Sequence, residues 1–176
     1  MSTTQNVFVY GTLMYPQVLQ ALLNRVPSSC KACIHGFKRY NIKGQLFPAV
    51  IKASPDCKVE GVLLRELTPE DMIVFDEFEG DEYYKLPVQP QVMLEDGNES
   101  SGTTAAATAA ATVFASVYIW QDSLRGLLYG VWDPEYFAKT HLEAYVKMCI
   151  AFAEELKEEQ KEKPMNRPLG FGSSSQ

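Results

Sequence analysis

Histidine, cysteine and long apolar runs are scarce in this chain, and each shortage excludes a class of function. The 176 residues include two histidines, His35 and His141, on unrelated segments, so we expect no catalytic histidine arrangement. The first six residues are polar, and the apolar run that follows is too short for a signal-peptide core or a membrane span. A cytoplasmic protein without a membrane partner is therefore expected.

The four cysteines, Cys30, Cys33, Cys57 and Cys149, are few for this length, and thiols in the cytosol stay reduced. The first two have the CxxC spacing that occurs in redox and zinc proteins. A zinc site needs four ligands, however, and the sequence has no second close pair. A CxxC redox or zinc protein remains an alternative, and we expect no metal and no cofactor.

Acidic residues outnumber basic ones by 22 to 16, which gives a formal charge of −6. No stripe of lysine and arginine offers a surface that neutralises phosphates, so nucleic acid is not an expected partner. A hydrophobic fraction of 46% is enough for a sizeable core in one domain. We place this domain at residues 1–163, with a low-complexity insertion at residues 95–112 and a disordered tail at residues 164–176.

A strand, a turn and a helix are predicted in succession near the amino terminus. Val7 to Tyr10 is short, apolar and β-branched, and Pro16 to Leu23 has its apolar residues at helical spacing. The turn between them contains Gly11, and such turns leave backbone N–H groups free to hold an anion or a developing oxyanion. The pattern alone does not separate such a site from an ordinary strand–turn–helix corner.

Residues 68–71, Thr-Pro-Glu-Asp, predict the start of a second helix because a capping threonine precedes proline and two acidic residues. The apolar side chains expected on its buried side are Met72, Ile73, Phe75 and Phe78. Glu79 lies near that buried stripe by its spacing, whereas Asp76 and Glu77 point in other directions. A desolvated carboxylate accepts protons near neutral pH. The alternative is a solvated charged helix end.

The rest of the chain mixes strand and helix signals. Residues 34–64 alternate short apolar runs with glycine and proline, which predicts several short strands. Residues 113–120 predict another strand, with Val117 and Ile119 on one face. A long amphipathic helix is predicted to begin at residues 133–135, with His141 on its flank. Together these elements indicate an α+β fold.

Two segments of this chain carry a family resemblance. The first is Tyr10-Gly11-Thr12-Leu13-Met14-Tyr15, and the second is residues 75–80, Phe-Asp-Glu-Phe-Glu-Gly, followed by Tyr83-Tyr84-Lys85. In this order they resemble the gamma-glutamylcyclotransferase-like family, most closely its gamma-glutamylamine cyclotransferase and plant avirulence-induced (AIG-like) branch. The resemblance continues through residues 36–40, 47–50 and 59–63, so it spans residues 7–88.

The resemblance implies a small mixed β-barrel with flanking helices, and an enzyme that converts a small gamma-glutamyl amide into 5-oxoproline. The substrate's own α-amine attacks its γ-carbonyl, so the protein supplies a base, a folded substrate conformer and stabilisation of the oxyanion. By resemblance Glu79 is the general base. The implied substrate-binding residues are Tyr10, Gly11, Thr12, Leu13, Met14 and Tyr15, with Tyr83 and Tyr84 as further candidates for pocket walls.

Lys85 departs from the family pattern, because relatives commonly carry arginine after the aromatic residue. The ammonium group of lysine is a point charge and cannot form the paired, planar hydrogen bonds of an arginine guanidinium, so this departure bears on substrate choice and on activity. The alternative function is a stress-related binding or interaction protein that kept the fold and lost turnover. The leaving group stays open among a free amino acid, an amine, a cross-linked lysine and the cysteinylglycine of glutathione. The oligomeric state stays open too.

Overall fold

The computed structural model describes residues 3–93 and 113–163. The insertion expected at residues 95–112 and the disordered tail expected at residues 164–176 lie outside the described residues. The single-domain boundary at residue 163 therefore stays a prediction.

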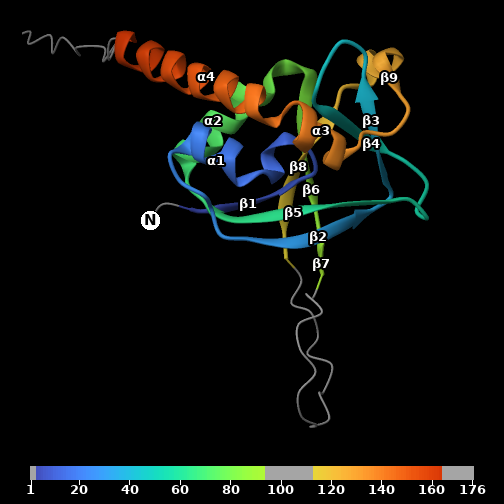
Figure 1. Cartoon of the computed structure of the whole chain (residues 1–176). Helices are drawn as coiled ribbons and strands as arrows, with labels where there is room; N and C mark the ends of the chain where they lie inside the picture. Colours follow the sequence, from blue (N-terminus) through green and yellow to red (C-terminus); the bar gives the residue numbers. More distant parts are fainter. Residues whose placement is uncertain (1–2, 94–112, 164–176) are drawn as a thin grey trace, which may run out of the picture.

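Two β-sheets pack against each other in the described part of the chain (Figure 1). The larger sheet has the strand order β6 (Tyr83–Val88), β8 (Ala115–Trp120), β1 (Gln5–Val9), β5 (Lys58–Leu67), β2 (Ser29–His35) and β7 (Gln91–Val92). The smaller sheet has the order β4 (Pro48–Lys52), β3 (Phe37–Ile42) and β9 (Leu128–Tyr129). Strand β1 runs parallel to β8 and antiparallel to β5, so the larger sheet is mixed. Strand β4 lies against β8, and β3 lies against β5.

Helices cover one face of the larger sheet, where Figure 1 shows α1, α2 and α4 together. The helical segments are η1 (Thr12–Met14), α1 (Pro16–Leu23), α2 (Pro69–Glu79), η2 (Gly80–Glu82), η3 (Asp122–Leu127), α3 (Pro134–Thr140) and α4 (Leu142–Glu162). None of the described helices combines the length and apolarity needed to cross a membrane. The prediction of an α+β fold with flanking helices and a long carboxyl-terminal helix is confirmed. The strands of the expected small mixed barrel form two sheets that contact each other through β4 with β8 and through β3 with β5.

Strand β1 is buried on both faces, which explains its unbroken apolar sequence. Val7 and Val9 pack in the cluster formed with the helices, whereas Phe8 between them packs with Val50 and Leu63 in a second cluster between the sheets. All three β1 side chains are almost fully buried. The end of β1, where the glycine turn begins, is therefore held by packing on both sides.

Helix α2 begins as its sequence predicts. The Thr68 side chain accepts a hydrogen bond from the backbone N–H of Asp71, and the Asp71 carboxylate accepts one from the N–H of Thr68. This capping box satisfies donors that have no partner inside the helix. One expectation is wrong, because Ile73 is 52% exposed. Met72 and Phe75 carry the buried stripe instead, and one residue along a helix turns a side chain by about 100° away from it.

The predicted long helix from residue 134 is divided in the structure. Helix α3 ends at Thr140, and α4 begins at Leu142, with His141 between them at φ −123° and ψ −18°. The His141 ring lies against the rings of Tyr136 and Phe137, with centroids 5.7 and 6.3 Å away. His141 is thus the joint between two helices, and the expectation that it lies on the flank of one helix is wrong. Hydrophobic spacing did not reveal the break because both helices carry apolar residues at the same period.

Candidate active site

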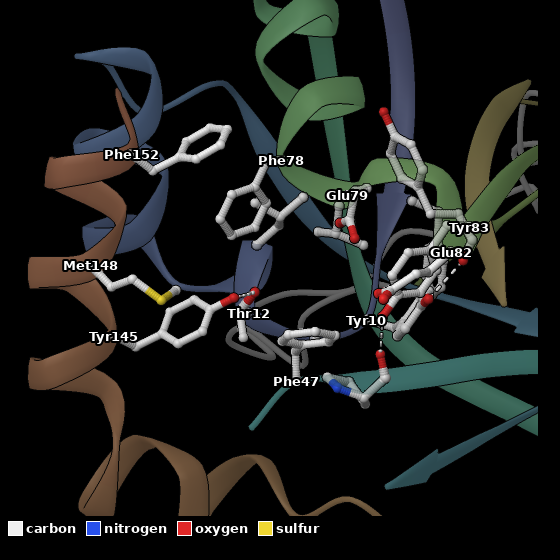
Figure 2. A pocket seen from close by; sticks show the side chains of 16 residues that line it. Tyr10, Thr12, Phe47, Phe78, Glu79, Glu82, Tyr83, Tyr145, Met148 and Phe152 are labelled. Atoms are coloured by element: carbon white, nitrogen blue, oxygen red, sulfur yellow. Dashed lines mark hydrogen bonds between the residues drawn. The ribbon is translucent and has the colours of Figure 1, made fainter. Parts of the chain in front are cut away.

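A cavity of about 230 Å³ lies where the end of β1, the end of α2 and one side of α4 meet (Figure 2). Its described lining consists of residues 8–13, Phe47, Pro48, Phe78, Glu79, Glu82, Tyr83, Tyr118, Tyr145, Met148 and Phe152. Segments far apart in the sequence therefore contribute to one cavity, which is open to solvent on one side. Of the residues that we predicted for substrate binding, Tyr10, Gly11, Thr12 and Leu13 line it, together with Glu79 and Tyr83.

The turn after β1 presents backbone donors to this cavity. The N–H of Met14 donates to the carbonyl of Gly11 at 3.0 Å, and the N–H of Tyr15 donates to the carbonyl of Thr12 at 3.4 Å. The N–H groups of Thr12 and Leu13 come first in the short helix η1, so they have no acceptor within it. Two adjacent donors of this kind can hold a carboxylate or an oxyanion.

Gly11 is required by a close approach between the turn and β4. A Cβ atom at this position would lie 2.8 Å from both Cγ and Cδ of Pro48, which is closer than real Cβ contacts come. The carbonyl of Pro48 in turn accepts a hydrogen bond from the Tyr83 hydroxyl at 3.0 Å. Pro48 therefore contacts the turn through its ring and β6 through its carbonyl.

Arg39 supports the same turn from the other side, and sequence reasoning missed it. Its guanidinium donates to the carbonyl of Tyr10 at 2.7 Å and lies 5.3 Å from the centroid of the Trp132 ring. Burial lowers the pKa of Arg39 from its ordinary value. Arg39 lies in the segment 36–40 that carries the resemblance, but nothing in its spacing indicates a contact with the end of β1.

Glu79 is the last residue of α2, and Figure 2 shows its side chain directed into the cavity. Gly80 follows at φ 69° and ψ −165°, a conformation that other residues rarely adopt, so the chain leaves the helix abruptly after the carboxylate. Glu79 is partly buried overall, while its carboxylate lies among cavity-lining side chains. Burial raises the pKa of Glu79 from 4.5 to about 8.

Three tyrosines around Glu79, Tyr10, Tyr83 and Tyr118, donate their hydroxyl protons to other acceptors. Tyr10 donates to the carbonyl of Tyr118 at 2.6 Å, and Tyr118 donates to the Asp76 carboxylate at 2.7 Å. Tyr83 donates to a backbone carbonyl, as described above. Within the described ranges, Glu79 therefore receives no hydrogen bond from a side chain or from the backbone.

Burial, with a smaller contribution from the negative charge of Glu79, raises the pKa of Tyr10 and Tyr83 well above the ordinary tyrosine value. Burial and the hydrogen bond to Asp76 raise the pKa of Tyr118. Burial also raises the pKa of Tyr145, although its hydrogen bond with Thr12 acts in the opposite direction. These hydroxyls stay neutral at physiological pH. Glu79 is accordingly the acid–base group of the cavity that titrates nearest to neutrality.

Three predicted binding residues lie outside this lining. Met14 packs against the core cluster below the helices, and Tyr84 packs against the cluster between the sheets. The Tyr15 hydroxyl donates to the carbonyl of Pro134 at 2.7 Å, and its ring lies 5.5 Å from that of Phe137. In this structure the three residues support the site from behind and do not face the cavity.

Lys85 also lies outside the lining of the cavity. Its Nζ is 2.9 Å from one carboxylate oxygen of Asp76, and Tyr118 donates to the other oxygen. Both members of this ion pair are close to half exposed. Lys85 is therefore linked to the cavity only indirectly, by its ion pair with Asp76 and the hydrogen bond between Asp76 and Tyr118. It does not itself line the cavity.

The CxxC pair has a geometry that does not suit a disulfide. Cys30 and Cys33 lie three positions apart on strand β2, so their side chains project from opposite faces. Both are free thiols. Across the residues that the structure describes, no group of three or more histidine, cysteine or acidic side chains could hold a metal ion. The strand geometry thus speaks against a Cys30–Cys33 redox couple.

One prediction about Glu79 can be tested without a substrate. In the unfolded chain this carboxyl ionises near 4.5 and in the folded protein near 8, so the folded state binds more protons between these values. Stability from this group therefore falls as pH rises through that window. Glu79→Gln should match the parent in melting temperature at pH 4 and exceed it by roughly 10 °C at pH 9. The exposed Glu77→Gln is the control, and an equal gain there would contradict the burial of Glu79.

Comparisons with known proteins agree with this fold and with the resemblance in the sequence. The family model described as gamma-glutamyl cyclotransferase, AIG2-like, matches residues 7–134. AIG2-like protein D of Arabidopsis thaliana is 39% identical over 154 residues, which cover 88% of this chain and 92% of the relative. AIG2-like protein C of the same plant is 33% identical over 149 residues, covering 85% and 78%. A solution structure of an Arabidopsis thaliana protein matches 99% of both chains at 25% identity, with a TM-score of 0.57. The chain therefore belongs to the AIG2-like gamma-glutamyl cyclotransferase family.

Proposed function

We propose that this protein converts a gamma-glutamyl amide into 5-oxoproline and releases the attached amine, with Glu79 as the general base. The observation that carries the proposal is the carboxylate of Glu79. It faces the cavity, has a pKa raised to about 8 and receives no hydrogen bond from the described residues. A substrate ammonium group is the partner that such a carboxylate lacks.

The reaction divides between the two sides of the cavity. Glu79 takes a proton from the substrate's α-ammonium group, and the freed amine attacks the γ-carbonyl carbon to form the new C–N bond of a five-membered ring. The N–H groups of Thr12 and Leu13, two residues that line the cavity, then stabilise the carbonyl oxygen as it gains negative charge. Glu79 passes the proton that it took to the nitrogen of the original amide, whose C–N bond then breaks. The attacking nitrogen loses its second proton through the same carboxylate to the departing amine, which leaves as its ammonium form, and the ring keeps a neutral amide N–H. No enzyme nucleophile is required, because both reacting groups belong to the substrate.

Product analysis tests this function. The purified chain is incubated with a panel of gamma-glutamyl compounds, and 5-oxoproline and the released amine are quantified. We expect both products in equal amounts. Ligand binding in calorimetry without any 5-oxoproline would instead favour a binding protein that retains the fold.

The pH dependence of the rate provides a further prediction. Because kcat/KM reports the protonation of the free enzyme, it should rise about tenfold per pH unit below the pKa of Glu79 and level off above about 8. Initial rates of 5-oxoproline release between pH 5.5 and 9 measure this profile. A rate that is flat between pH 6 and pH 8 would show that the base ionises with an ordinary carboxyl pKa.

A further inference from the structure

The cavity has an apolar side that the proposed chemistry does not use. We define this apolar wall as Phe47, Phe78, Tyr145, Met148 and Phe152. Figure 2 shows Tyr145, Met148 and Phe152 on α4, Phe78 on the end of α2, and Phe47 between Thr12 and Tyr10. The Phe78 ring meets those of Phe152 and Tyr145 edge to face, with centroids 5.5 and 6.4 Å apart. Such aromatic contacts fix the rings in place, so the wall has a defined shape.

The charged residues of the cavity lining are all acidic. None of the sixteen described residues that line the cavity is lysine, arginine or histidine. The ionisable acids among them are Glu79 and the exposed Glu82. Lys85, the nearest base in sequence to Glu82, is paired with Asp76 at 2.9 Å. A carboxylate on the leaving group would therefore enter the cavity without a cationic partner, which is unfavourable.

The apolar wall lies directly beside the parts that would hold the glutamyl group. Phe78 immediately precedes Glu79, and Phe47 immediately precedes Pro48, whose ring contacts the Gly11 turn. On this proposal Glu79 binds the glutamyl ammonium, and the backbone N–H groups of the turn serve the glutamyl α-carboxylate and the γ-carbonyl oxygen. The part of the substrate still without a partner is the leaving amine, and the part of the cavity still without a role is the apolar wall. Met148, which is 49% exposed, marks the end of this wall toward solvent.

Resting on the proposed function, we infer that the apolar wall is the leaving-group subsite. The substrate class is then gamma-glutamyl amides of apolar or aromatic monoamines. Gamma-glutamyl amino acids and peptides, which carry a second carboxylate, fit less well. An amine with a second, cationic group would have to place that charge against the apolar wall or turn away from it toward the exposed Glu82, so it should also bind less well and forms a separate arm of the test.

Binding is measured first, by calorimetry on Glu79→Gln, in which slow turnover keeps the ligands intact. The probes are gamma-glutamylphenethylamine, gamma-glutamylphenylalanine, which adds one carboxylate to the same skeleton, and the gamma-glutamyl amide of 1,5-diaminopentane. The first should bind at least about tenfold more tightly than either of the others. Equal affinity for all three, or a preference for either charged probe, would overturn the inference.

A charge placed on the apolar wall should change this selectivity. Met148→Arg supplies a cation at the solvent end, so the ratio of kcat/KM for gamma-glutamylphenethylamine to that for gamma-glutamylphenylalanine should fall roughly tenfold. Ile150→Arg is the matched control, since Ile150 is 44% exposed on the same helix and lies outside the lining. Its ratio should equal that of the parent. A fall of the same size in both variants would reveal a general charge effect and would remove Met148 from the subsite.

The two measurements separate the subsite from the reaction. Selective binding of the phenethylamine probe without 5-oxoproline release would keep the subsite and reject the proposed function. Release of 5-oxoproline at similar rates from all three probes would keep the function and reject the subsite.

Discussion

Glu79→Gln should lower kcat for 5-oxoproline release by roughly a hundredfold or more, the usual scale for loss of a general base. Glutamine keeps nearly the same shape and can still accept a hydrogen bond, but it cannot take the ammonium proton. The fold should survive, because the carboxylate of Glu79 forms no hydrogen bond with the described residues that the change would break. Steady-state kinetics beside a thermal melt measure both effects on the same preparation.

Two neighbouring acids serve as controls for that result. Glu77 is exposed on α2 and lies outside the cavity lining, so Glu77→Gln should keep parental turnover. Glu82 lines the cavity from its exposed edge, and Glu82→Gln should change turnover far less than Glu79→Gln. Parental turnover in Glu79→Gln would show that Glu79 is not the general base. A loss of turnover in Glu82→Gln alone would assign the general base to Glu82.

Gly11→Ala should reduce kcat/KM on the order of a hundredfold, through displacement of the turn. The added Cβ would lie 2.8 Å from two ring atoms of Pro48, so either the turn or the proline must move. A displacement of about 1 Å in a group that positions the substrate commonly costs this much in rate. The N–H groups of Thr12 and Leu13 would then no longer meet the substrate at hydrogen-bond distance.

A matched glycine is available as the control. Gly126 has open space at its Cβ position and no positive φ, so Gly126→Ala should leave kinetics and melting temperature unchanged. Assays well below the melting temperature of each variant separate a displaced turn from simple unfolding. Unchanged kcat/KM in Gly11→Ala would show that the turn does not contact the substrate.

The sequence predicts those elements of the fold that depend on interactions between residues close together in the chain. The capping threonine and the proline after it are enough to start α2, because their hydrogen bonds lie within four residues of sequence. The helical period then directs Glu79 toward the interior. Gly11 was recognised as a turn residue, although its actual constraint, the ring of Pro48, lies 37 positions away and leaves no mark in the local pattern.

The opposite side of the cavity was not predictable in this way. Apolar spacing indicates that Tyr145 and Phe152 are on the inner face of α4, but it does not say whether they fill the core or line an open space. That depends on how α4 crosses the end of α2, which is a long-range packing choice. Arg39 was missed for the same reason, since its contact with Tyr10 joins two strands that are distant in sequence.

The stoichiometry of product release tests the central claim most directly. The purified protein is given gamma-glutamylphenethylamine at pH 8, and 5-oxoproline, free glutamate and phenethylamine are measured over one time course. We expect 5-oxoproline and phenethylamine to appear one to one, with no glutamate and with the signal lost in Glu79→Gln. Release of glutamate in place of 5-oxoproline would mean that water is the nucleophile, and equal 5-oxoproline release by Glu79→Gln would mean that another group is the base.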